Sequence, residues 1–74
     1  MNKEIKLMMY KALRNRFEAE QLEALATLHI YFEKPAGIGE HPQIIEEMAK
    51  QFEKLSSAED RLVSLKTHFL EYIN

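Results

Sequence analysis

The 74-residue chain contains no cysteine, so disulfide bonds and thiolate metal sites are excluded. A single hydrophobic core of this size supplies roughly 3 to 5 kcal/mol of stability. Small folds usually add a disulfide, a metal or self-association to that core. We therefore expect this chain to rely on efficient helix packing or on association with another chain.

Long apolar runs are also absent. No segment approaches the roughly 20 apolar residues of a membrane span. The first sixteen residues, MNKEIKLMMYKALRNR, place charges where a signal peptide would be apolar. We expect a soluble, cytoplasmic protein without a membrane partner. With 46% apolar and 30% charged residues, rich in helix formers, the composition predicts an all-α fold rather than disorder.

Glycine and proline are scarce, with two of each, and all four lie in the stretch KPAGIGEHP at residues 34–42. Lys34 precedes a proline and is therefore biased out of the helical region, while Pro42 suits the first position of a new helix. The sequence predicts long helices over about 2–33 and 42–72 with a turn at 34–41. The whole chain, 1–74, then forms one antiparallel two-helix hairpin.

The second predicted helix carries one apolar stripe. Its members follow one another by three or four residues, as in a coiled-coil seam, with one short step between Leu55 and Ala58. We expect this stripe to pack on the first helix. The run Ser56-Ser57-Ala58-Glu59 also matches a capping box, so a break there and a three-helix bundle is the alternative. The stripe consists of Ile45, Met48, Phe52, Leu55, Ala58, Leu62, Leu65, Phe69 and Tyr72.

The first predicted helix is apolar on two faces, although a hairpin gives it only one neighbouring helix. One face contains Leu22, Leu25, Ala26, His29 and Phe32, together with Met8, Ala12 and Ala19; the other contains Leu13, Phe17, Ala24, Leu28 and Tyr31. A face left in water would mark an interaction surface, and pairing two hairpins into a four-helix bundle would bury it. We predict a homodimer whose interface uses Leu13, Phe17, Leu28 and Tyr31 with Ile45, Met48, Phe52, Leu55, Leu62, Leu65 and Phe69. A different protein on the same face is an equivalent reading.

The sequence offers little support for catalysis or cofactor binding. Gly37-Ile38-Gly39 begins a phosphate-binding pattern, but the residues that follow do not complete it. The pairs His29/Glu33 and His68/Glu71 have a spacing that suits one metal ion, yet no Glu-x-x-His motif of di-iron bundles appears. No serine lies in a nucleophile elbow. We therefore expect no enzyme activity, no metal and no cofactor.

Charge is distributed unevenly along the chain. Residues 1–16 carry five basic side chains and one acidic one, whereas residues 17–74 carry five basic and eleven acidic ones. Lys3, Lys6, Lys11 and Arg14 form a partial basic stripe that could contact nucleic-acid phosphates. The small number of basic residues and the lack of a recognition module argue against nucleic acid, which remains the alternative function.

Two runs, KALRNRFEAEQLEALATLHIYFEKP and GIGEHPQIIEEMAKQFEKLSSAEDRL, resemble small helical proteins of tailed bacteriophages of marine bacteria, including cyanophages. The similarity covers most of the chain and assigns no role to any residue. It implies a phage gene product in a bacterial cytoplasm, where a different protein covering the second apolar face would be a host or phage protein. Because that group is uncharacterised, the resemblance is compatible with a small structural or adaptor protein and does not define a biochemical activity.

Overall fold

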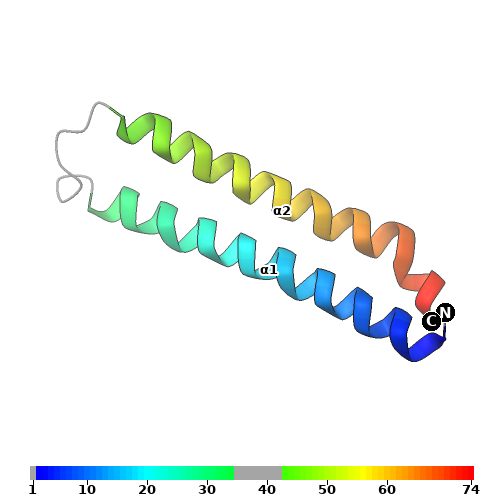
Figure 1. The fold of residues 1–74 in the computed structure, drawn as a ribbon. Coiled ribbons are helices and arrows are strands. Elements are labelled where there is room, and N and C mark those ends of the chain that lie inside the picture. The colour runs from blue at the N-terminus through cyan, green and yellow to red at the C-terminus, as the bar shows by residue number, and fades with distance from the viewer. Residues whose placement is uncertain (1, 35–42) are drawn as a thin grey trace.

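The computed structural model describes residues 2–34 and 43–74, which form two long helices side by side (Figure 1). Helix α1 spans Lys3–Glu33 and helix α2 spans Ile44–Ile73. The helices are antiparallel, so both ends of the chain lie at the same end of the rod. The predicted all-α hairpin is therefore confirmed, with helix bounds within two residues of those expected.

The C-terminal end of α1 and the N-terminal end of α2 are next in sequence to the stretch that contains the glycines and prolines. Lys34 has φ −134° and ψ 56°, outside the helical region, as expected for a residue before proline. Its N–H still donates to the Ile30 carbonyl at 2.9 Å, which completes the last turn of α1. The predicted turn beyond Lys34 and the predicted helix start at Pro42 lie outside the described residues.

Helix α2 runs without interruption through Ser56 and Ser57, so the three-helix alternative is wrong. The Ser56 hydroxyl donates to the Phe52 carbonyl at 2.8 Å, one turn earlier in the same helix. The hydroxyl is therefore used within the helix rather than as a cap. Asn2 does cap a helix, because its side-chain oxygen accepts a hydrogen bond from the Ile5 N–H at 2.9 Å.

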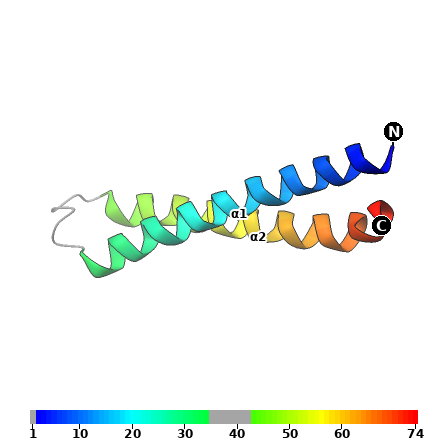
Figure 2. The same cartoon turned by 90° about the horizontal axis from the view of Figure 1, so that it is seen from below.

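The core lies along the line where α1 and α2 meet, and it differs between the middle and the terminal end. In Figure 2 the two helices cross near the middle of the hairpin. Ala24 of α1 and Ala58 of α2 are fully buried. Small side chains at a contact between helices permit a short distance between the helix axes. Toward the termini, Tyr10, Leu65 and Ile73 form a cluster of larger side chains, against which Phe17 and Leu70 pack. None of the polar side chains in the described part of the chain is buried.

The predicted register of α2 is wrong in its first half. Ile45 and Phe52 are 72% and 47% exposed, whereas the neighbouring Ile44 and Gln51 are half-buried. The buried stripe follows positions 44, 48, 51, 55, 58, 62 and 65, an unbroken alternation of four- and three-residue steps. The predicted stripe has two parts, one before and one after Leu55, which lie on different sides of a continuous α2. The two parts therefore cannot both face α1.

The face of α1 that packs on α2 is the one that we had assigned to the contact between two copies. Leu28 is buried, and Phe17 and Tyr31 are half-buried, because this face packs on α2 within the hairpin. The other face, with Leu22 and Phe32, is the exposed one. The prediction that one face of α1 lacks a neighbour in the hairpin is confirmed, but the residues assigned to that face were wrong. Dimerisation itself stays a prediction.

Candidate functional site

The first candidate site is an exposed apolar surface on one flank of the hairpin, here called the outer apolar face. It is formed by Leu22, Leu25 and Phe32 of α1 with Ile45 and Phe52 of α2. At 100° per residue, the three α1 residues fall within an arc of about 80° that lies to one side of the buried seam. The Phe32 and Phe52 rings meet edge to face with centroids 6.5 Å apart, so both helices contribute to the same flank.

Four of the five side chains of the outer apolar face are exposed. Leu22 is 66% exposed and Phe32 is 63% exposed, in addition to the exposure of Ile45 and Phe52 given above. Contiguous exposed apolar side chains on a small protein mark a surface that another molecule covers. The surface lies in the half of the rod farthest from the chain termini, and Met48 and Leu55 at its edge are half-buried.

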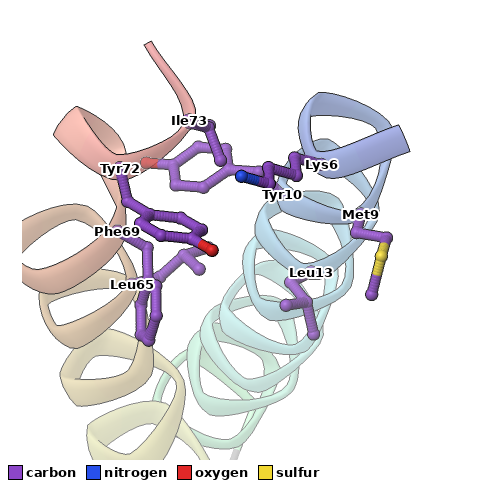
Figure 3. Close-up of a pocket in the computed structure, with 8 residues that line it drawn as sticks. All are labelled: Lys6, Met9, Tyr10, Leu13, Leu65, Phe69, Tyr72 and Ile73. Atoms are coloured by element: carbon purple, nitrogen blue, oxygen red, sulfur yellow. The ribbon is translucent and has the colours of Figure 1, made fainter. Parts of the chain in front are cut away.

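The second candidate site is an apolar groove between the terminal ends of the two helices, here called the terminal groove (Figure 3). Its volume is about 320 Å³. In Figure 3, Phe69 and Tyr72 of α2 lie across from Lys6 and Leu13 of α1. The lining consists of Lys6, Met9, Tyr10, Leu13, Leu65, Phe69, Tyr72 and Ile73.

The terminal groove arises from a change in the buried stripe at the end of α2. After Leu65, the side chains turned inward are Leu70 and Ile73, while Phe69 and Tyr72 are exposed. The predicted position of Phe69 in the seam is therefore wrong. The displaced aromatic rings form one wall of the groove, and Leu13, also exposed rather than packed in a seam, forms part of the other.

Lys6 is the only charged side chain among the described residues that line the groove. Its ammonium nitrogen lies 4.4 Å from the centre of the Tyr72 ring. At this distance the cation is attracted to the face of the ring. The groove therefore has a positive charge at Lys6, and its other described lining side chains carry no charge.

The flank that carries the terminal groove is charged over the rest of its length, and we call that part the charged flank. Arg61 pairs with Glu20 at 3.5 Å, and Lys54 pairs with Glu23 at 3.6 Å. Both pairs join α1 to α2. The guanidinium of Arg61 also lies 5.9 Å from the centre of the Phe17 ring. A polar groove beside these pairs is lined further by Lys50, Glu53 and Ser57.

The residues proposed for nucleic-acid contact are partly engaged within the chain. Arg14 pairs with Glu18 at 3.7 Å on its own helix, and Lys6 rests on Tyr72. Lys3 and Lys11 are exposed. At 100° per residue they point about 80° apart around α1. Binding of nucleic acid by these four residues stays a prediction.

Charge separates along the length of the hairpin. We call residues 2–17 and 59–74 the terminal half, and residues 18–34 and 43–58 the connector half. The terminal half carries seven basic and four acidic side chains, a net of +3. The connector half carries three basic and seven acidic ones, a net of −4. The rod, 54 Å long over its described residues, therefore has a positive and a negative end.

Neither histidine pair belongs to a metal-binding cluster. Within residues 2–34 and 43–74, no three His, Asp or Glu side chains lie close enough to hold a metal ion. Neither of the helices in this part of the chain has the length and apolar character needed to cross a membrane. His29 and His68 are both exposed.

Comparison with protein-family models, with curated proteins and with solved structures finds no match. The resemblance to phage proteins therefore stays a prediction, and the functional argument rests on the surfaces of the hairpin.

The terminal groove was not predicted from the sequence, although a signal for it is present. Met9 and Leu13 lie outside both the buried seam and the outer apolar face of α1, and an antiparallel hairpin places them opposite Phe69 and Tyr72. Two apolar residues outside the seam of one helix, placed opposite two apolar residues of the other helix, can indicate such a groove. The predicted seam had instead assigned Phe69 and Tyr72 to the core.

Proposed function

We propose that this protein is a small non-enzymatic interaction protein that self-associates through the outer apolar face. Two hairpins joined at this face would form a four-helix bundle. The observation that supports the proposal is the exposure of Leu22, Phe32 and Ile45 on one flank of the chain. Burying a Leu or Phe side chain contributes roughly 1.5 to 3 kcal/mol, a large fraction of what a core of this size supplies.

A second copy of the chain is the partner that needs no additional surface. The outer apolar face lies in the connector half, so two hairpins joined at this face overlap through their connector halves, and an antiparallel arrangement keeps the terminal halves at opposite ends of the dimer. Both connector halves are negatively charged, so we expect high salt to strengthen this contact. A symmetric dimer also uses the same surface on both copies, so one apolar face is enough to make the whole interface.

The experiment compares two leucine-sized exposed residues in the connector half. Leu22→Gln changes the outer apolar face, and Ile30→Gln changes a residue of similar exposure, 58%, that points about 80° from Leu22 and about 160° from Phe32 around α1. We expect Leu22→Gln to raise the dimer dissociation constant by about tenfold or more, because each dimer loses two buried leucines. Sedimentation equilibrium over a wide concentration range measures this constant for both variants and the parent.

Ile30→Gln is the matched control and should dissociate like the parent. Helicity measured by circular dichroism verifies that both variants keep the hairpin. A parent that stays a monomer at millimolar concentration, or an equal effect of both substitutions, would overturn the proposal. A monomer would also redirect the search toward a foreign partner for the same face.

The resemblance to tailed-phage proteins adds a cellular setting to this proposal. In that setting the dimer would act as a structural or adaptor protein in an infected bacterium. A tagged parent protein and the Leu22→Gln variant, expressed during infection, would be recovered with their bound proteins. An adaptor that works as a dimer should lose its partners in the variant, while Ile30→Gln should keep them.

A further inference from the structure

We propose that the terminal groove binds a single-chain amphipathic anion, a fatty-acid-like carboxylate whose chain lies between the helices and whose head pairs with Lys6. The groove volume of about 320 Å³ falls at the lower end of the range of small-molecule sites. The proposal concerns a different surface from the outer apolar face and does not depend on dimerisation.

The shape of the groove selects a linear ligand. Its lining runs from Lys6 to Leu13 on α1 and from Leu65 to Ile73 on α2. At 1.5 Å per residue, both segments are about 11 Å long, so the groove follows roughly two turns of each helix. A straight alkyl chain fits a groove that is long in one direction and open on one side (Figure 3).

The chemistry of the lining selects an apolar chain with one negative group. Leucine, isoleucine, methionine and aromatic side chains make up the walls, and Lys6 supplies the one charge among the described lining residues. A sugar or a nucleotide would need several polar partners along its length, which these walls do not provide. The net charge of +3 in the terminal half attracts an anion to this end of the rod.

A second copy of the chain is a poorer occupant of the groove. Leu13 and Glu20 point about 20° apart on α1, so the groove and the charged flank lie on the same side of the hairpin. A helix packed along that side would have to remove water from the Glu20–Arg61 and Glu23–Lys54 pairs. A short ligand confined to the terminal end covers the apolar residues without touching these pairs.

The test measures the binding of three ligands with the same twelve-carbon chain, below their micelle concentrations: dodecanoate, dodecanol and dodecyltrimethylammonium. Two-dimensional ¹⁵N–¹H NMR of the full chain gives both the affinity and the location. We expect dodecanoate to bind most tightly and to shift the amides of Lys6, Leu13 and Tyr72. Dodecanol should bind about fivefold more weakly, since one partly exposed ion pair contributes about that much.

Three variants assign the binding to the groove. Lys6→Gln should reduce the preference for dodecanoate over dodecanol to about onefold, and Lys6→Arg should retain it. Leu13→Asp, which puts a negative charge in a half-exposed position of the wall, should abolish dodecanoate binding. Leu22→Gln on the outer apolar face is the control and should bind like the parent.

Several results would overturn the proposal. These are equal binding of the three ligands, an unchanged preference in Lys6→Gln, and amide shifts centred on Leu22 and Phe32 instead of the groove. Binding to phosphatidylglycerol vesicles without any binding of monomeric dodecanoate would also overturn it, because a membrane surface would then be the partner.

Discussion

The terminal half and the connector half of the hairpin are built from the same two helices but are packed differently. The connector half holds Ala24 and Leu28 in the seam, with Ala58 at its boundary, and the two alanines are fully buried. The terminal half holds Tyr10, Leu65 and Ile73, and a groove remains beside them. The comparison shows that small side chains in the seam are covered completely, whereas the larger side chains at the terminal end border an open groove.

The two halves also differ in what they expose. The connector half is negatively charged and presents the outer apolar face, whereas the terminal half is positively charged and presents the terminal groove. A hairpin of this size therefore carries two apolar sites on opposite flanks and at opposite ends. We propose a second copy of the chain as the occupant of the first site and a small ligand as the occupant of the second.

The largest expected effect tests the packing difference directly. Leu28→Ala in the connector half should cost about 2 to 5 kcal/mol, because Leu28 is buried and its truncation leaves a cavity in the seam. Leu65→Ala should cost less, since Leu65 already borders the groove and its removal enlarges an open space. Urea denaturation at equal protein concentration gives both values. A larger cost for Leu65→Ala would mean that the two halves are packed equally well.

Leu28 and Phe17 were first expected at a contact between copies, where their truncation would weaken assembly. Their places in the hairpin change that expectation, because both side chains pack on α2 of the same chain or on its core cluster. Phe17→Ala and Leu28→Ala should therefore lower the stability of the hairpin itself.

The second effect probes the close approach of the helices. Ala58→Leu adds three carbon atoms at a fully buried position and should destabilise the hairpin by about 1 to 3 kcal/mol through overpacking. Ala26→Leu makes the same change on an exposed position of α1. It should alter stability by less than about 0.5 kcal/mol. Thermal unfolding followed by circular dichroism compares the two, and equal melting temperatures would argue against close packing at Ala58.

The smallest effect concerns the charge difference between the halves. The chain has no cysteine, so single cysteines introduced by Lys11→Cys and His29→Cys can be oxidised selectively. In an antiparallel dimer joined at the outer apolar face, the two His29→Cys residues lie in the overlapping connector halves and the two Lys11→Cys residues lie far apart. In an equal mixture, the disulfide between two copies of His29→Cys should therefore predominate. High salt should increase its yield, because both connector halves are negatively charged. Electrophoresis without reductant separates the three products if one variant carries a tag, and an equal yield of the disulfide between two copies of Lys11→Cys would indicate parallel dimers.

The sequence predicted the helices well because their limits are local. Two long segments without glycine or proline favour helix at nearly every position, and Lys34 leaves the helical region because a proline follows it. The alternative of a break at Ser56 also rested on a local signal, and it was wrong. The Ser56 hydroxyl can bond either to a helix start or to the preceding turn, and the hairpin retains the second arrangement.

The candidate sites were less predictable, because they depend on which side chains the second helix covers. The sequence showed that α1 has two apolar faces, but spacing alone gave no reason for α2 to choose the face of Leu28 over the face of Leu22. The same ambiguity affected α2. Ile45 and Phe52 fit a stripe of apolar residues, whereas Ile44 and Gln51 fit an unbroken heptad pattern, and both patterns have helical spacing.

The sequence by itself determined that this chain is an α-helical hairpin, that α1 is too apolar for one neighbour, and that the two ends carry opposite charge. These properties follow from composition, spacing and the positions of glycine and proline. Only the tertiary structure decided which face of α1 is buried, which register α2 adopts, and where the groove opens. The physical reason is that packing depends on the combined shapes of two helices, and a residue such as Phe69 can satisfy the helical pattern equally well in the seam or beside it.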